Sequence, residues 1–393
     1  MTETTNAQAV QEKRTALYDE HAALGASFTD FGGWQMPLKY GSELAEHKAV
    51  REAAGLFDLS HMGEVWATGP GAGAFLDYAL VGKLSAIAVG KAKYSLICAE
   101  DGGIIDDLIV YRVAEDDFLV VPNAGNAETV AAELASRLEA FQTADGGGAA
   151  GAVALRDASA ETSLVAVQGP NAEAILLSVA GSEDHEDIRQ LKYYAGIEAT
   201  IAGVPVFLAR TGYTGEDGFE LFVGNELAVQ LWKALEEAGK AHGLVPCGLA
   251  CRDSLRLEAG MPLYGNELSR GRSPFAGGLG GVVALKSKEG DFVGRAALEA
   301  KKAEGEGTTS GQRLVGLKGL GRRAARSHYA VMKDGVQVGE VTSGQPSPTL
   351  GYPVALAYVD VEHSAVGTKL DADLRGKAEP FEVIELPFYK RQK

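Results

Sequence analysis

The sequence has few cysteines and no long apolar run, and both shortages narrow what the protein can be. Its 393 residues include three cysteines, an odd and sparse set that is typical of a reducing compartment. No apolar run approaches the ~18 residues of a membrane-spanning helix. The N-terminal stretch "MTETTNAQAVQEKRTALYDE" is polar and lacks the apolar core of a signal peptide. We therefore predict a cytoplasmic protein with no membrane partner.

Positive charge is also scarce. The chain has 37 Lys and Arg against 53 Asp and Glu, a formal net charge of −16. That balance disfavours nucleic-acid phosphates and anionic membranes as main partners, so we expect no nucleic acid. The densest basic cluster is explained better by a solvated loop than by a binding patch, and consists of Arg322, Arg323 and Arg326.

Signatures of several common enzyme classes are missing. "GPGAGAF" and "GGLGGVV" are glycine-rich but do not fit G-x-G-x-x-G in a βαβ setting, and no G-x-x-x-x-G-K-[ST] occurs. No G-x-S-x-G or H-E-x-x-H occurs either. "CGLAC" carries Cys247 and Cys251 without a second ligand pair, so two small core residues explain it better than a metal site. We expect no metal and no bound nucleotide, which disfavours nicotinamide and flavin enzymes.

Strand and helix patterns alternate too irregularly for a doubly wound sheet, so we predict an α+β fold with mainly antiparallel sheets. Hairpins are expected across Asp101-Gly102-Gly103 and Ala202-Gly203. Ser42 is the expected N-cap of a helix that stops at Gly55. Its expected face consists of Leu44, His47, Arg51 and Ala54, and the apolar part of that face is expected to pack. Further helices are expected over residues 126–141, 171–181, 225–243 and 247–261, the last led by Pro246.

The C-terminal part reads differently. From about residue 310 the helical signals stop, and a hairpin with Asp334-Gly335 at its turn is followed by further strands. We interpret this end as a separate β-barrel. The chain is accordingly divided into residues 1–285, with two interleaved subdomains, and a barrel domain of residues 286–393.

"GGIIDDLIVYRV", residues 102–113, places two carboxylates in an apolar strand. Side chains alternate along a strand, so Asp106 and Asp107 point to opposite faces. Burying an ionised carboxylate is costly unless a partner pairs with it. We expect one acid to be structural, accepting turn amides or pairing with a cation. The other would face a ligand site, where it can hold a cationic or N–H-bearing reactant and tune proton transfer.

Other polar residues allow two interpretations each. Glu220 in "RTGYTGEDGFEL" could accept paired N–H donors from a planar heterocycle, or be an ordinary exposed strand residue. Two arginines, Arg252 and Arg256, lie four residues apart on one side of a predicted helix. Arginine side chains bind carboxylates or planar oxygens through two-point hydrogen bonds, although a solvated helix face is the more usual interpretation. Rings that could stack on a ligand, or simply belong to core or rim, are Tyr94, Tyr193, Tyr194 and Tyr213.

Taken in order, these stretches resemble one family: the T-protein of the glycine cleavage system, an aminomethyltransferase that uses tetrahydrofolate. The resemblance covers nearly the whole chain and is specific as an ordered set, although each stretch alone is weak. It implies three domains around a central folate-binding opening, the last a β-barrel. The matching stretches are "FGGWQMPLKYGS", "EHKAVREAAGLFDLSHMGEV", "KYSLICAEDGGIIDDLIVYRV", "VVPNAGN", "RTGYTGEDGFEL", "PCGLACRDSLRLEAGMPLYGNEL" and "EVTSGQPSPTLGYPVALAYV".

The resemblance also assigns residues. Asp107 matches the essential aspartate beside the reactive folate nitrogens, and is the expected catalytic residue. Glu220 and Arg252 match the pair that reads the pterin and orients the cofactor. Tyr193 lies in "QLKYYAG", a less diagnostic stretch. The residues that match cofactor-binding positions are Tyr94, Asn123, Tyr193, Tyr213, Glu220 and Arg252.

The implied reaction takes an aminomethyl group from the lipoyl arm of a separate carrier, the H-protein, which binds transiently. Ammonia is released, and tetrahydrofolate, a co-substrate, becomes 5,10-methylenetetrahydrofolate. A demethylase of the same fold would need no lipoyl carrier. A non-enzymatic folate-binding protein of iron–sulfur maintenance would carry a Lys-Gly-Cys loop, which this sequence lacks. A fused flavin amine oxidase would need the missing dinucleotide fingerprint.

Overall fold

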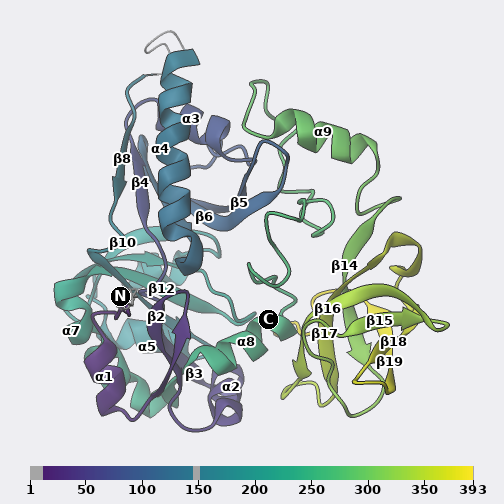
Figure 1. Cartoon of the computed structure of the whole chain (residues 1–393). Helices are drawn as coiled ribbons and strands as arrows, with labels where there is room; N and C mark the ends of the chain where they lie inside the picture. Colours follow the sequence, from purple (N-terminus) through teal and green to yellow (C-terminus); the bar gives the residue numbers. More distant parts are fainter. Residues whose placement is uncertain (1–11, 145–150, 393) are drawn as a thin grey trace, which may run out of the picture.

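The computed structural model describes residues 12–144 and 151–392. Two sheet-based layers are stacked at one side of the molecule, and a closed barrel stands beside them (Figure 1). This arrangement confirms the α+β fold with a C-terminal β-barrel. Among the described helices, none is both long and apolar enough to cross a bilayer.

The first layer is a five-stranded antiparallel sheet. Helices α3 (Ala72–Ala79) and α4 (Ala127–Ala144) cover one of its faces, where Phe75 and Leu134 are fully buried. The predicted hairpin at Asp101-Gly102-Gly103 joins its first two strands and is confirmed. From edge to edge the strands are β5 (Lys91–Cys98), β6 (Ile104–Ala114), β7 (Asp117–Pro122), β4 (Val65–Thr68) and β8 (Ala154–Asp157).

The second layer is a six-stranded sheet. Helices α5 (Ala172–Val179) and α7 (Asn225–Gly239) pack on it, burying Trp232 completely. The predicted turn at Ala202-Gly203 is confirmed, with φ of +53° and +75° that suit a tight type I′ hairpin. Its strands, in order, are β10 (Gly196–Ile201), β11 (Val204–Ala209), β12 (Gly218–Gly224), β9 (Thr162–Gln168), β3 (Ala54–Asp58) and β13 (Leu244–Pro246).

Smaller elements complete this half of the chain. Strands β3 and β13 pair in parallel, whereas the other neighbours in the second sheet pair antiparallel. Because Pro246 belongs to β13, it does not lead the following helix as predicted. The remaining elements before the barrel are α1 (Tyr18–Ala23), β1 (Ser27–Phe31), β2 (Trp34–Lys39), α2 (Glu43–Glu52), α6 (His185–Gln190), α8 (Leu249–Glu258) and α9 (Arg295–Ala303).

Helix α2 begins as predicted but ends earlier. The Ser42 hydroxyl accepts a hydrogen bond from the Ala45 N–H at 3.3 Å, which confirms the N-cap. The predicted stop, Gly55, instead lies inside β3. A Cβ there would come within 2.5 Å of the Val50 side chain and 2.7 Å of the Cys247 sulfur. Close packing of α2 on this strand, not helix termination, therefore requires the glycine.

The predicted packing face of α2 is confirmed in part. Its members His47 and Ala54 are buried, but Leu44 is 57% exposed, and Glu46 is buried as well. Glu46 accepts main-chain hydrogen bonds from Tyr40 and Gly248, so its burial is compensated. The three cysteines are free and buried, and Cys247 and Cys251 belong to an apolar core cluster, as predicted. Their sulfurs also lie within 4.8 Å of a Glu46 carboxylate oxygen.

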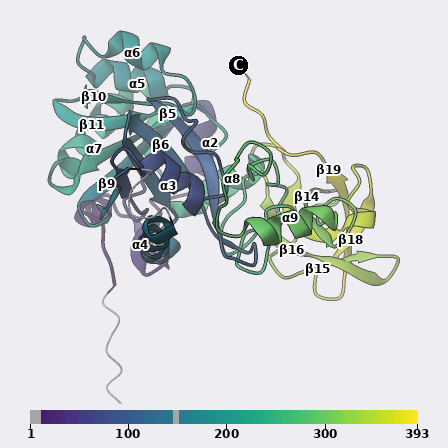
Figure 2. The same cartoon turned by 90° about the horizontal axis from the view of Figure 1, so that it is seen from above.

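The barrel closes on itself with six strands. Asp334 and Gly335 have φ of +51° and +83° and join two of them, confirming the predicted turn. Figure 2 shows the barrel beside the two layers, with α8 on the side that faces it. In order around the barrel the strands are β14 (Gln312–Gly319), β17 (Pro353–Asp360), β16 (Val336–Pro346), β15 (Ala330–Lys333), β18 (Lys369–Asp373) and β19 (Ala378–Ile384).

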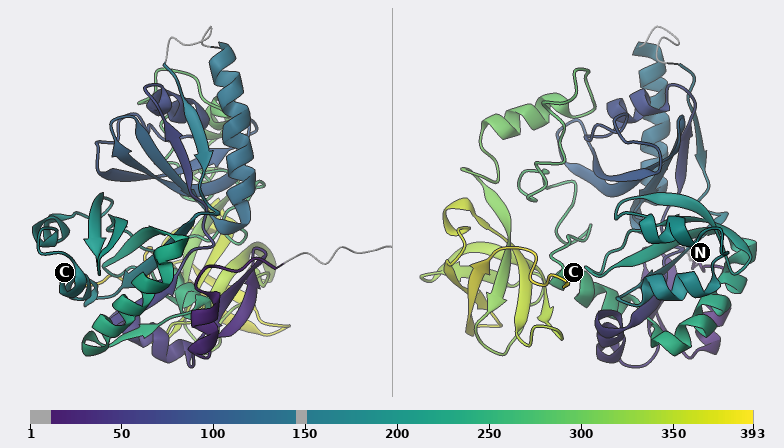
Figure 3. Two further views of the ribbon diagram at one scale, coloured as in Figure 1. Left: turned by 90° about the vertical axis from the view of Figure 1, so that its left-hand side faces the viewer. Right: turned by 180° about the vertical axis from the view of Figure 1, so that it is seen from behind.

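A long segment links α8 to the barrel and includes α9, which lies above the barrel and beside the first layer (Figure 3, right). Leu298 of α9 is fully buried in a cluster with Leu96 and Ile104 of the first layer. The barrel strands begin only at Gln312. The domain boundary at residues 285 and 286 stays a prediction.

Candidate active site

The two layers pack face to face, and a cavity of about 320 Å³ lies between them. Strands β6, β7 and β12 contribute its walls, and α8 closes one side. Most of the lining is apolar, with a few polar groups that converge on the cavity. That combination is typical of small-molecule sites. Although larger cavities exist, this one brings together nearly all of the predicted site residues.

Tyr193 is the predicted residue that does not line the cavity. Its side chain is 46% exposed, and the neighbouring Tyr194 lines the cavity instead. Tyr194 has φ of +60°, and the two rings meet edge to face with centroids 4.9 Å apart. Two adjacent tyrosines give no sequence signal for which ring points inward. The predicted residues that do line it are Tyr94, Asp107, Asn123, Tyr213, Glu220 and Arg252.

The adjacent acids have the divided roles that strand alternation indicated. Asp106 is fully buried and accepts hydrogen bonds from the Asn123 N–H at 2.9 Å and the Asn126 amide at 2.7 Å. This confirms a structural acid that accepts turn amides. Asp107 faces the cavity and accepts from the Tyr94 hydroxyl at 2.9 Å. The Asn123 side-chain amide contacts both carboxylates at 2.9 Å and fixes their relative position.

Burial controls the protonation of this pair. It raises the pKa of the Asp107 carboxyl to about 6, against the opposing hydrogen bonds from Tyr94 and Asn123. Burial and the neighbouring Asp107 charge also raise the pKa of Asp106. Burial raises the pKa of Tyr94 as well, so its hydroxyl remains a donor. Asp107 is therefore an ionised acceptor at neutral pH that can exchange a proton under mild conditions.

Glu220 and Arg252 both line the cavity, and among the described residues Arg252 has a buried polar atom without a partner. Glu220 is 8% exposed, and one carboxylate oxygen accepts from the Thr211 hydroxyl at 2.5 Å. Within the described residues, the buried Nη1 of Arg252 has no hydrogen-bond partner. Its guanidinium lies 5.1 Å from the centre of the Tyr213 ring. Because an unpaired buried donor is costly, we expect a ligand to satisfy it.

The solvated-face interpretation of α8 is wrong. Arg256 is 1% exposed and pairs with Glu267 at 2.8 Å, while Arg252 lines the cavity. Arg256 also donates to the Met261 carbonyl at 3.1 Å and to the Ser343 hydroxyl of the barrel at 2.8 Å, so it connects α8 to the following loop and to the barrel. These contacts position the helix that carries Arg252.

Sequence reasoning missed His61. It lines the cavity, is 4% exposed, and its Nδ1 has no hydrogen-bond partner among the described residues. Burial lowers its pKa to about 4; the Arg252 charge adds to this effect and Asp58 opposes it. The ring is therefore neutral at pH 7, with a nitrogen free to accept or donate. Its signal was a histidine directly after a fully buried strand, in "DLSHMGEV".

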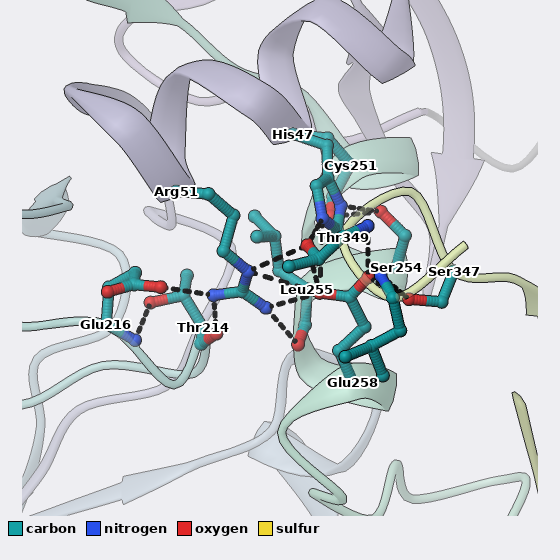
Figure 4. Close-up of polar contacts among 11 residues, drawn as sticks. His47, Arg51, Thr214, Glu216, Cys251, Ser254, Leu255, Glu258, Ser347 and Thr349 are labelled. Carbon is teal, nitrogen blue, oxygen red and sulfur yellow. Dashed lines mark hydrogen bonds and ion pairs between the residues drawn. The ribbon is translucent and has the colours of Figure 1, made fainter. Parts of the chain in front are cut away.

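Helix α8 is also anchored to the barrel through a cluster around Glu258 (Figure 4). The Glu258 carboxylate, 1% exposed, accepts from Arg51 at 2.9 Å, Ser347 at 2.5 Å and the Thr349 hydroxyl at 2.7 Å. His47 lies 3.2 Å away. Burial alone would raise the pKa of Glu258, but these partners lower it to about 2. The Glu258 cluster joins α2, α8 and the loop after β16.

The comparisons with known proteins agree with this architecture. The chain matches the GCVT N-terminal domain over residues 17–287 and the glycine cleavage T-protein C-terminal barrel domain over residues 312–390. An aminomethyltransferase of Streptomyces coelicolor is 56% identical, covering 97% of this chain and 98% of the relative. An aminomethyltransferase of Cutibacterium acnes is 53% identical, and the match covers 96% of this chain and 99% of the relative.

A solved structure agrees as well. The crystal structure of glycine cleavage system aminomethyltransferase T from Bartonella henselae superposes with a TM-score of 0.86 at 36% identity. The match covers 97% of this chain and 99% of that one. With these matches over both parts, the chain belongs to the glycine cleavage T-protein family of aminomethyltransferases.

Proposed function

We propose that the protein takes the aminomethyl group from the lipoyl arm of H-protein and passes its carbon to tetrahydrofolate. The carbon–sulfur and carbon–nitrogen bonds break, so the products are 5,10-methylenetetrahydrofolate, ammonia and the dihydrolipoyl arm with its thiol restored. Family membership supports an aminomethyl transfer, and one observation supports the finer reaction. A single cavity presents the Asp107 carboxylate together with the Glu220 carboxylate and the unpaired Nη1 of Arg252. A cytoplasmic location fits the three free cysteines.

The cavity residues fit a reduced folate. A pterin ring presents N–H donors and a carbonyl acceptor on one edge, and Glu220 and Arg252 offer the complementary acceptor and donor. Tyr194 and Tyr213 supply rings beside this pair. Tetrahydrofolate, when bound, supplies the nitrogen nucleophiles of the reaction. No metal is needed for these steps.

Asp107 is the residue we assign to catalysis. Its carboxylate can hold the amino group of the incoming arm and stabilise positive charge as the carbon–nitrogen bond breaks. Tyr94 and Asn123 fix the carboxylate before substrate arrives, so little reorganisation is needed. The remaining acceleration comes from holding two reactants together, which can lower the barrier by several kcal/mol.

One experiment tests the proposal. Purified protein is mixed with aminomethylated H-protein, and ammonia release is measured with and without tetrahydrofolate. Fast release that requires tetrahydrofolate is the expected result. Ammonia release at the same rate with and without tetrahydrofolate would refute the proposal. Turnover of a free methyl-sulfur donor in the absence of H-protein would also refute it.

A further inference from the structure

A second cavity, of about 570 Å³, lies at the other end of the space between the two layers. The same strands line both cavities. On β6, Tyr111 faces the first cavity and Val113 the second; on β7, Val121 faces the first and Leu119 the second. Side chains two apart on a strand share a face, which explains this division. The two cavities therefore lie along one interlayer surface.

Three aromatic rings stand between them. Tyr111, Phe207 and Phe222 contact one another with ring centroids 5.5 to 5.9 Å apart. Phe207 and Phe222 then form a wall of the second cavity, together with Trp66. The second cavity is thus a separate, partly aromatic compartment.

Glu64 is the feature of this cavity that most needs an explanation. It lines the cavity, is 1% exposed, and neither carboxylate oxygen has a hydrogen-bond partner among the described residues. Its main chain is fixed, since its N–H donates to the Ser159 hydroxyl at 2.9 Å and its carbonyl accepts from Ala158 at 2.8 Å. A buried carboxyl without partners is costly. A bound group from outside the chain would supply the missing partner.

The charges around Glu64 favour a cation. Asp184 and Glu198 also line the cavity, the latter exposed at its rim. Asp184 already accepts the Thr200 N–H at 2.7 Å. Arg156 is the basic residue of the lining, and its guanidinium is paired with Glu161 at 3.2 Å. Carboxylates beside aromatic faces recognise organic cations through charge and cation–π attraction.

We propose that the second cavity binds a small organic ammonium ion, with its charged nitrogen against Glu64 and its alkyl groups against Trp66, Phe207 and Phe222. A volume of about 570 Å³ accommodates such an ion. The proposal does not depend on aminomethyl transfer, because no residue of the first cavity takes part.

Binding has a proton signature. Burial and the nearby Asp157 charge raise the pKa of Glu64 well above its usual range, which favours the neutral carboxyl when no cation is bound. The other charged groups facing it are Arg156, Asp184 and Glu198. A bound ammonium ion would favour the carboxylate, and the carboxyl proton would pass to the buffer. One cation taken up should therefore release up to one proton.

Trimethylammonium chloride is the probe, because it offers one N–H for Glu64 and three methyl groups for the rings. Trp66 reports on the cavity, so saturable quenching of its fluorescence is expected, and should be absent in Trp66→Phe. Calorimetric titration in buffers of different ionisation enthalpy should show the proton release. The probe should also raise the melting temperature of the unmodified protein above that in sodium chloride of equal ionic strength.

Two variants locate the site. Glu64→Gln keeps the side-chain shape and should weaken binding about tenfold or more, because the charged partner is lost. Asp107→Asn removes a carboxylate from the first cavity and should leave this binding intact. The proposal would be overturned if Glu64→Gln bound trimethylammonium as tightly as the unmodified protein, or if Asp107→Asn lost that binding. It would also be overturned if the melting temperature were the same in trimethylammonium chloride and in sodium chloride.

Discussion

Replacing Glu258 by glutamine should destabilise the folded protein strongly at neutral pH. Its carboxylate is 1% exposed and is held by His47, Ser347 and Arg51. The hydrogen bonds and charges of these partners, those of His47 first, bring the pKa from its usual 4.5 to about 2 in the folded protein. Each pKa unit corresponds to about 1.4 kcal/mol, so the ionised form gains roughly 3 kcal/mol on folding. Glutamine keeps the shape but turns an acceptor into a donor that faces Arg51.

The loss should depend on pH in one direction. A carboxyl whose folded pKa lies below its unfolded value stabilises the protein fully above the unfolded value, here about 4.5. That contribution disappears as pH falls toward about 2. The difference in unfolding free energy between the two proteins should therefore be about 3 kcal/mol at neutral pH and shrink below pH ~4.5.

Urea unfolding at a series of pH values measures this difference. The three tryptophans lie outside the barrel, so their fluorescence follows the two layers, while hydrogen exchange follows the barrel strands. Glu128→Gln is the control, because its pair with Lys13 is exposed and should contribute under about 1 kcal/mol. A loss in Glu258→Gln as small as in the control, or one that is constant with pH, would refute the reasoning.

The remaining predictions concern the first cavity and the partner. Asp107→Asn should lower turnover about 10²–10³-fold with the fold intact, whereas Asp106→Asn should act mainly on stability; the reverse result would exchange their roles. The unmodified enzyme should lose rate as pH falls through about 6, because Asp107 becomes protonated, and a flat acid limb would contradict this. Glu220→Gln should weaken tetrahydrofolate binding in calorimetric titration, and equal affinity would leave Glu220 as a strand residue. The apparent KM for H-protein should rise, and its salt dependence flatten, when glutamine replaces the basic cluster Arg322, Arg323 and Arg326. Unchanged KM at low ionic strength would exclude that cluster as the docking site.

Local signals predicted much of the fold. Asp334-Gly335 marks a turn because both residues tolerate positive φ, and the structure confirms it. Successive side chains of a strand point to opposite faces, whatever the strand packs against. This alternation alone predicted that one of Asp106 and Asp107 would be structural and the other would face a cavity. These features are encoded within a few residues of one another.

Other features depend on contacts that are distant in sequence. Gly55 looks like a helix stop, but the glycine is required because the Val50 side chain and Cys247, which is far along the chain, both lie too close for a Cβ. Leu44 looks like a core residue, yet α2 instead buries the polar groups that meet Glu258. The missing partners of Glu64 are a property of the folded structure alone. Propensity and periodicity cannot report such contacts.

The closed barrel has a consequence for how this protein can be recombined. A six-stranded barrel satisfies its own main-chain ladder and offers no edge strand to the rest of the molecule. Its junction with α8 consists of side-chain contacts, with Leu257 against Val354 and Leu356 and with the polar cluster beside them, and of a main-chain hydrogen bond from the Tyr389 N–H, after the last barrel strand, to the Glu258 carbonyl at 2.8 Å. A barrel from a relative could therefore be exchanged as a module, provided that this small set of junction side chains is exchanged with it.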